Sequence, residues 1–241
     1  MNKVVLITGA SKGIGASCAQ IFASNGYDVI INYNTSIQQA NILKEEIRKK
    51  FNVKCLTYKC DVSNENEVIK FFENVKKDFS KIDVLINNAG IAKDNFLDKK
   101  TVEEFKQVIN TNLVGTFMIT KYFSKIMDEG SIINISSTNA IDSYYPESID
   151  YDASKAGIIS LTHNYAKAFA PKIRVNAICP GWVNTKHNDL LTEGEKESLS
   201  KNILLGRFGS PMEIAKVVFF VANDASYINN AVIRVDGGEL C

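Results

Sequence analysis

Seven short apolar runs recur along the 241-residue chain, each bounded by Gly, Asn, Asp or Ser. Such runs are typical of buried strands. Longer segments with apolar residues at helical spacing separate most of them, including 37–51, 65–79 and 102–126. Strands that alternate with helices predict an α/β fold of Rossmann type, a doubly wound parallel sheet with helices on both faces. The expected strands are Val4–Ile7, Val29–Ile31, Val53–Tyr58, Val84–Ile86, Ile132–Ile135, Ile173–Ile178 and Ala231–Val235.

The chain shows no sign of a second domain. No linker, repeat or low-complexity tract interrupts the alternation, so residues 1–241 are interpreted as a single domain. Thr101 and Ser210 each stand three residues before a Glu, a spacing that predicts the start of a helix. The less regular stretch 182–202 is interpreted as a mobile insert over a site.

Charge and cysteine content narrow the class of protein. The 28 Lys and Arg residues and 27 Asp and Glu residues leave a net charge of +1, so neither nucleic acid nor an anionic membrane is expected as a partner. No apolar stretch approaches the roughly 20 residues of a membrane-spanning helix. The five cysteines show no metal-ligand spacing, and an odd number cannot all pair within one chain. We therefore expect reduced thiols, a cytoplasmic location and no metal.

The first expected strand ends in the glycine-rich segment Thr8-Gly9-Ala10-Ser11-Lys12-Gly13-Ile14-Gly15. Glycines let a backbone turn tightly and approach a pyrophosphate, and the N–H groups of a following helix face the anion. The spacing is G-x-x-x-G-x-G, which differs from the standard dinucleotide-binding G-x-G-x-x-G. Taken alone, the segment is equally consistent with a cofactor site and with an ordinary turn.

The second expected strand runs into Asn32-Tyr33-Asn34-Thr35-Ser36. An acidic residue is usual here where the ribose 2′-hydroxyl of NAD is bound, and none is present. Neutral side chains avoid repelling a 2′-phosphate, and Lys12 could add a positive charge. The sequence predicts a preference for NADP(H), with Lys12 as a solvated surface lysine being the alternative.

Tyr151 and Lys155 stand four residues apart in a helical segment, so their side chains project from one face. Lowering a phenol pKa from about 10 to near 7 requires about 4 kcal/mol in favour of the phenolate. A cation about 4.5 Å away supplies roughly that much at an effective dielectric of about 20, but only about 1 kcal/mol in water. We therefore expect Tyr151 to be a catalytic acid that Lys155 activates only in a sheltered site.

Ser137 follows an expected strand, at the edge where open α/β sheets bind ligands, and is expected to hold a substrate carbonyl. Each signal has a plainer interpretation, because a Tyr/Lys pair is usually surface packing and a serine after a strand is usually a turn. Their joint occurrence downstream of a glycine-rich turn favours an active site.

In this order and over the whole chain, the motifs resemble the short-chain dehydrogenase/reductase family. Thr8–Gly15 resembles its cofactor turn, Asn87–Gly90 its NNAG segment, and residues 180–185 the loop at the nicotinamide end. The resemblance implies the catalytic residues Asn112, Ser137, Tyr151 and Lys155. It implies cofactor binding by Gly9, Ser11, Lys12, Gly13, Ile14, Gly15, Tyr33, Asn34, Asp61, Val62, Asn88, Ala89, Gly90, Tyr151, Lys155, Pro180, Gly181, Val183 and Thr185.

The resemblance also implies a mechanism. Hydride passes directly between C4 of the nicotinamide and a carbonyl or alcohol carbon, and Tyr151 exchanges the proton. Ser137 would orient the carbonyl, Lys155 would lower the phenol pKa and bind the ribose, and Asn112 would hold a water that links Lys155 to solvent. Paired long helices starting near Thr101 and Tyr151 would build a homotetramer.

Within the family, residues 32–34, 206–211 and 235–238 look most like 3-oxoacyl-acyl-carrier-protein reductases, which implies carbonyl reduction with NADPH. The match weakens at 142–150, which is longer and more acidic than usual, and at 228–231, where a Thr-Gly pair is usual. Other short-chain alcohol, sugar or steroid dehydrogenases remain alternatives, as does a protein that senses NADP(H) without chemistry.

Charged residues near these departures bear on the substrate. Glu147 and Asp150 are interpreted as solvated loop charges rather than as substrate contacts. The substrate is expected to be a small carbonyl compound or one linked to acyl-carrier protein. Because that carrier is acidic, a basic docking patch is expected, with Arg174 and Arg207 as candidates.

Overall fold

The computed structural model describes residues 2–185 and 191–239. Within them, seven parallel strands form one sheet in the order β3-β2-β1-β4-β5-β6-β7, and each overlaps one expected strand. The predicted fold class, a seven-stranded doubly wound parallel sheet, is confirmed. The strands are β1 (Val4–Ile7), β2 (Asp28–Tyr33), β3 (Cys55–Lys59), β4 (Val84–Asn87), β5 (Gly130–Ile135), β6 (Ile173–Pro180) and β7 (Val232–Val235).

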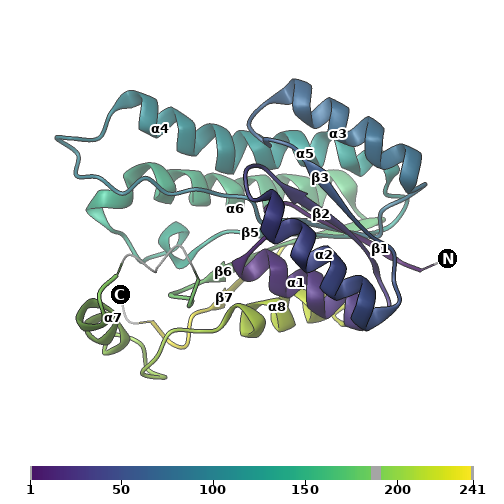
Figure 1. The fold of residues 1–241 in the computed structure, drawn as a ribbon. Helices are drawn as coiled ribbons and strands as arrows, with labels where there is room; N and C mark the ends of the chain where they lie inside the picture. The colour runs from purple at the N-terminus through teal and green to yellow at the C-terminus, as the bar shows by residue number, and fades with distance from the viewer. Residues whose placement is uncertain (1, 186–190, 240–241) are drawn as a thin grey trace.

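Helices cover both faces of the sheet (Figure 1). The strands are mostly apolar because successive side chains point to opposite faces and both faces are covered. In β1, for example, Val5 and Ile7 belong to one buried cluster while Val4 and Leu6 belong to the other. One face carries α3 (Glu65–Asp78), α4 (Val102–Ile109), α5 (Gly115–Phe123) and α6 (Ile149–Phe169), and the other carries α1 (Gly13–Ser24), α2 (Ile37–Phe51) and α8 (Pro211–Phe219).

The expected helix 102–126 is interrupted. Between α4 and α5 lies η1, a π-helical turn (Asn110–Val114), and η2, a 3-10 turn (Ser124–Ile126), ends the segment. Periodicity cannot reveal one wide turn, because the apolar spacing on either side stays helical. π-Helical turns often mark functional sites, and this one lies beside the cleft described below. The start at Thr101 is confirmed, as is the one at Ser210, because each residue forms a complete capping box.

The stretch 182–202 contains more regular structure than the sequence suggested. Helix α7 (Glu193–Ser200) begins at a capping box formed by Thr192 and Glu195. The expectation of an irregular segment is wrong for these residues, because Thr192 and Glu195 have the spacing that starts a helix. Residues 186–190 of the expected insert lie outside the described residues, and the mobility of the insert stays a prediction.

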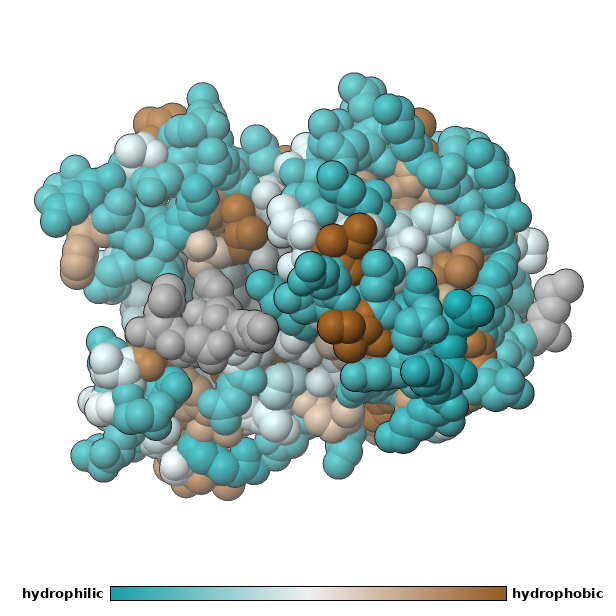
Figure 2. Space-filling model, viewed as in Figure 1, coloured by the Kyte–Doolittle hydropathy of each residue, from teal (hydrophilic) through white to brown (hydrophobic). Residues whose placement is uncertain are grey.

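The described surface is mostly hydrophilic in the view of Figure 2, with hydrophobic side chains in small separate groups. No helix in residues 2–185 or 191–239 is long and apolar enough to cross a membrane. Because all seven strands run in one direction, their carboxyl ends meet at a single edge of the sheet. The loops that follow the strands therefore lie close together there.

Candidate active site

A cleft of about 900 Å³ opens at the carboxyl edge of the sheet. Its walls come from the turn after β1, the segments that follow β2 to β6, and the start of α6. Of the predicted site residues, only Gly15 and Asn112 do not line it. Those that do are Gly9, Ser11, Lys12, Gly13, Ile14, Tyr33, Asn34, Asp61, Val62, Asn88, Ala89, Gly90, Ser137, Tyr151, Lys155, Pro180, Gly181, Val183 and Thr185.

Other lining residues were not among the predicted ones. The segment after β4 and the α4–η1 region contribute a wall because β4 pairs with β1 and so ends beside the glycine-rich turn. Sequence order conceals this neighbourhood, since β4 lies far along the chain from β1. The additional lining residues are Asn32, Thr35, Ser36, Cys60, Ser63, Ile91, Ala92, Gln107, Asn110, Thr111, Ile135 and Ser136.

The glycine-rich turn has the form of an anion cradle. Gly9 and Gly13 have φ of +62° and +58°, a backbone region that favours glycine. A Cβ at Gly9 would lie 2.8 Å from Ala89 Cα, and the Asn88 amide donates to the Gly9 carbonyl at 3.1 Å. No side chain of the described residues caps the start of α1 at Lys12. Its first N–H groups are therefore available to a phosphate.

Gly15 packs against the glycine-rich turn on the side away from the cleft, which it does not line. It lies inside α1, where an added Cβ would fall 2.8 Å from the Gly9 carbonyl oxygen and 2.9 Å from Ala10 Cα. The absence of a side chain therefore lets α1 approach the turn. Its contact with cofactor stays a prediction beside this packing role.

The end of β2 supplies neutral polar groups. The Asn32 side chain is buried, accepts the Gly9 N–H at 3.2 Å and donates to the Cys60 carbonyl at 3.0 Å, so it joins the ends of three strands. Beyond it, Tyr33 and Asn34 line the cleft together with Lys12. No carboxylate is present at this point of the described wall, which suits a phosphate on the ribose.

Helix α6 places Tyr151 and Lys155 in the cleft, with Lys155 Nζ 5.4 Å from the centre of the phenol ring. The ammonium donates to the Ile135 carbonyl at the end of β5, at 2.8 Å. Ser136 donates to the Lys155 carbonyl, also at 2.8 Å. These bonds fix the first two turns of α6 to strand β5 and so set the depth of both side chains.

Burial controls the protonation of the pair. It raises the pKa of Tyr151 to about 12, although a hydrogen bond with Ser137 opposes the rise and the carboxylates of Asp152 and Asp94 add to it. Burial also lowers the pKa of Lys155 to about 8. In the protein alone burial disfavours the phenolate, so the activation of Tyr151 by Lys155 stays a prediction. The phenol holds its proton at neutral pH, as a proton donor must.

Ser137 lies two residues after the end of β5, and hydrogen bonds hold its hydroxyl in place. Its Oγ donates to Asn139 Oδ1 at 3.0 Å, and Asn139 Nδ2 donates to Asp152 Oδ1 at 2.7 Å. The carboxylate accepts from the amide nitrogen, so the amide oxygen must face Ser137. Ser137, Tyr151 and Lys155 thus line one region of the cleft, as predicted.

Asn112 lies in η1 and is fully buried. Its side chain accepts the Ile91 N–H at 2.8 Å, and it donates to the Ile91 carbonyl at 2.9 Å and to Ser154 Oγ at 3.0 Å. The amide is therefore engaged with protein groups and ties the segment after β4 to α6. An added Cβ at Gly90 would meet both Asn112 Oδ1, at 3.3 Å, and Lys155 Nζ, at 3.6 Å, so the two side chains flank the same point of the chain.

The interpretation of Asp150 as a solvated charge is wrong. Its side chain is 0% exposed and forms an ion pair with Lys100, whose side chain is 3% exposed. The sequence could not show this partner, which lies 50 residues away. Glu147 is half-buried and does not line the cleft.

The two arginines proposed for docking have other contacts. Arg174 donates to the carbonyls of Ile228 and Ala222, and Arg207 pairs with Glu213 at 2.7 Å. Neither lines the cleft. In the part of the chain that the structure describes, no group of three or more His, Cys, Asp or Glu residues could hold a metal ion.

Relatives with curated names match the chain over nearly its full length. A 3-oxoacyl-acyl-carrier-protein reductase of Aquifex aeolicus strain VF5 is 38% identical over 98% of this chain and 97% of that protein. One of Staphylococcus aureus strain Mu50 is 40% identical over 99% of this chain and 98% of that protein. Residues 9–239 match a family model described as enoyl-(acyl carrier protein) reductase.

Solved structures agree in fold. A double mutant of a Serratia marcescens short-chain dehydrogenase/reductase has a TM-score of 0.92 at 29% identity, covering 98% of this chain and 97% of that one. A short-chain dehydrogenase of Burkholderia cenocepacia J2315 in complex with NADP has a TM-score of 0.92 at 28% identity, with the same coverage. ElxO with NADP bound has a TM-score of 0.90 at 35% identity, covering 99% and 98%. The chain therefore belongs to the short-chain dehydrogenase/reductase family.

Proposed function

We propose that this enzyme reduces the carbonyl of a 3-oxoacyl thioester to an alcohol with NADPH. One observation supports this above others. Tyr151 retains its proton at neutral pH, and it shares with Ser137 and Lys155 the cleft that the glycine-rich turn also lines. A protonated phenol beside a hydroxyl donor suits a carbonyl oxygen that gains negative charge during reduction.

The residues fit a bound NADP(H). The cofactor supplies hydride from its nicotinamide ring when bound. The N-terminus of α1 and the turn at Gly9 and Gly13 would hold its pyrophosphate, while Lys12, Tyr33 and Asn34 would surround the 2′-phosphate. NADP in two of the structural relatives supports this assignment.

The roles of the catalytic residues follow from their positions. Ser137 would hold the substrate carbonyl with its hydroxyl, and Tyr151 would donate the proton to the carbonyl oxygen. Lys155, anchored on Ile135, would bind the ribose and keep positive charge beside the phenol. Asn112 would act through its bonds to Ile91 and Ser154, which hold the cleft wall against α6.

The comparisons leave two reactions to distinguish. The full-length relatives are named as reductases of 3-oxoacyl groups, whereas the description of the family model names an enoyl group. The 3-oxoacyl reaction is favoured because the identity of those relatives extends over nearly the whole chain. An acyl-carrier-protein-linked thioester is accordingly the proposed substrate, with other short-chain alcohol, sugar or steroid substrates as outcomes of the test.

The test is a substrate panel read through NADPH absorbance. Acetoacetyl thioesters of acyl-carrier protein and of a small thiol are compared with a crotonyl thioester, simple ketones and sugars. We expect turnover with the acetoacetyl thioesters and a higher kcat/KM on the carrier. Faster turnover of crotonyl thioester would overturn the carbonyl assignment, and cofactor binding without turnover of any compound would indicate a sensor.

A homotetramer is the proposed assembly. Hydrophobic side chains are exposed on three helices that cover the same face of the sheet. They are Val102 and Phe105 in α4, Phe117 in α5 and Ile149 at the start of α6. Such side chains are suited to burial between subunits. Light scattering should give a particle of four chains, and a stable monomer would refute the proposal.

The four described cysteines are buried free thiols, which supports the proposed cytoplasmic location.

A further inference from the structure

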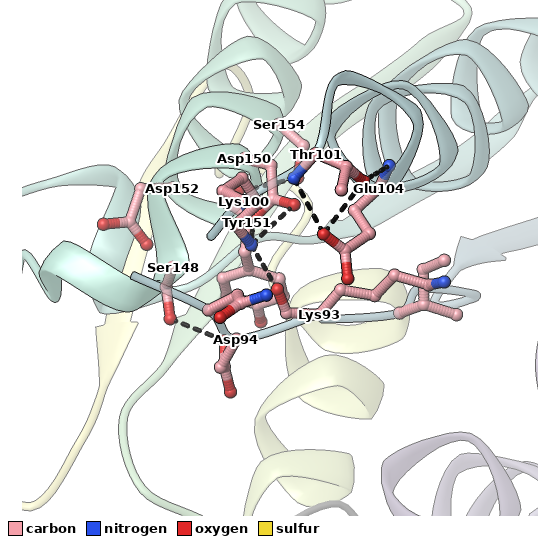
Figure 3. A network of polar contacts seen from close by, with 12 residues as sticks. Lys93, Asp94, Lys100, Thr101, Glu104, Ser148, Asp150, Tyr151, Asp152 and Ser154 are labelled. Carbon is pink, nitrogen blue, oxygen red and sulfur yellow. Dashed lines mark hydrogen bonds and ion pairs between the residues drawn. The ribbon is translucent and has the colours of Figure 1, made fainter. Parts of the chain in front are cut away.

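The loop between β4 and α4 is joined to the start of α6 by a buried ion pair. Lys100 Nζ lies 3.0 Å from both carboxylate oxygens of Asp150, and the two side chains are 3% and 0% exposed. Lys100 also donates to the Lys93 carbonyl, so it closes the loop on itself. Figure 3 shows the Lys100 ammonium between the Lys93 carbonyl and Asp150, at the first turn of the helix that carries Tyr151.

The ion pair reaches the catalytic tyrosine through the backbone. Asp150 Oδ1 accepts the N–H of Tyr151 at 2.9 Å, so one carboxylate joins Lys100 to the residue that donates the proton. A negative side chain is also favourable in the first turn of a helix. The position of the Tyr151 backbone is thus coupled to the loop.

Two weaker contacts reinforce the same junction. Ser148 Oγ donates to Asp94 Oδ1 at 2.8 Å, and the Asn95 N–H donates to the Glu147 carbonyl at 3.0 Å. Near the start of the loop, Ile91 lines the cleft and is also held by Asn112. The loop is therefore tied to the active site at both of its ends.

Burying two charges is costly, and a buried ion pair gains little stability over apolar side chains of similar volume. We propose that Lys100 and Asp150 are positioning residues for the reduction, holding the β4–α4 loop against α6 and so fixing Tyr151 relative to the cleft. The inference rests on the proposed reductase activity. A catalytic group displaced by about 1 Å can cost roughly 100-fold in rate, so a positioning pair should affect kcat.

The test uses Lys100→Met, Asp150→Asn and the double variant. Methionine keeps an unbranched side chain but removes both the charge and the N–H donors of Lys100. Asparagine keeps an oxygen for the Tyr151 N–H and removes mainly the charge. We expect each single variant to lower kcat about tenfold or more, with NADPH Kd within about threefold of wild type. The double variant should lose no more than the worse single variant, because the two residues act as a unit.

Two controls separate positioning from stability. Lys100→Arg keeps the cation and should retain kcat within about threefold. Lys99→Met removes an exposed neighbouring charge and should leave kcat unchanged. All rates are measured well below each variant's Tm, on protein whose NADPH binding confirms the fold. If Lys100→Met does not fold, Asp150→Asn and Lys100→Arg decide the question.

Single variants with kcat within twofold of wild type would overturn the proposal, as would a double variant whose loss equals the product of the two single losses. Wild-type turnover is established first with the acetoacetyl thioester. Failure of the wild type to turn over any carbonyl would instead contradict the proposed function, so the two failures are distinguishable.

Discussion

Lys155 Nζ lies 5.4 Å from the centre of the Tyr151 ring, one turn along the same helix, and donates a hydrogen bond to the Ile135 carbonyl. Burial acts on both groups in opposite senses, raising the pKa of the phenol to about 12 and lowering that of the ammonium to about 8. The protein alone therefore keeps Tyr151 protonated, and of these two groups Lys155 titrates nearer to neutral pH.

Tyr151→Phe should abolish reduction while leaving NADPH affinity nearly unchanged. The change removes the proposed proton donor but keeps the ring that packs in the cleft. A positioned acid typically contributes about 10²–10⁴-fold to the rate, so kcat should fall by about that factor. Steady-state rates and NADPH fluorescence titration measure the two effects separately. Substantial remaining turnover would remove Tyr151 from its role.

The pH profile should report Lys155. The ammonium carries its charge below its pKa and loses it as pH rises through about 8, well below the usual lysine pKa of 10.5. Reduction should therefore lose kcat/KM on the alkaline side of about pH 8, because neutral Lys155 no longer supports the phenol or the ribose. Tyr151, with a pKa of about 12, should not contribute a limb in that range.

Lys155→Arg provides the check on this assignment. Guanidinium stays protonated over the whole accessible range, so the alkaline limb should move out of view even if activity is lower. A limb that stays near pH 8 in this variant would have to come from another group.

Cofactor choice should respond to one charge at the end of β2. Asn34 lines the cleft beside Lys12, and Asn34→Asp would place a carboxylate where we assign the 2′-phosphate. Like-charge repulsion should lower kcat/KM for NADPH roughly tenfold or more. The rate with NADH on the same variant is the internal control and should not fall. Equal losses with both cofactors would argue against this location for the phosphate.

Gly15→Ala should destabilise the fold, although Gly15 itself does not line the cleft. The new Cβ would lie 2.8 Å from the Gly9 carbonyl oxygen, so the turn or α1 has to move. We expect the free energy of unfolding to fall by about 1–3 kcal/mol, as for other overpacked sites. Gly194→Ala in α7 is the matched control, since nothing lies within 4 Å of its Cβ. Denaturant unfolding should show it neutral, or stabilised by up to about 1 kcal/mol.

Much of the fold was predictable because its signals are local. The run Val4–Ile7 is apolar throughout, which is the pattern of a strand covered on both faces, and each expected strand overlaps an observed one. The glycine-rich turn was also readable, since positive φ at Gly9 and Gly13 limits which residues can occupy them. The π-helical turn Asn110–Val114 was not, because one added residue per turn leaves the surrounding periodicity intact.

The sequence by itself determined the order of strands and helices, the glycine-rich turn and the spacing of Tyr151 and Lys155, all of which depend on neighbours in the chain. Only the tertiary structure decided that Asp150 is buried against Lys100, that Asn112 bonds to Ile91 and Ser154, and that burial holds the proton on Tyr151. These properties depend on solvent exclusion and on partners brought together from distant segments. Spacing along a chain carries no information about either.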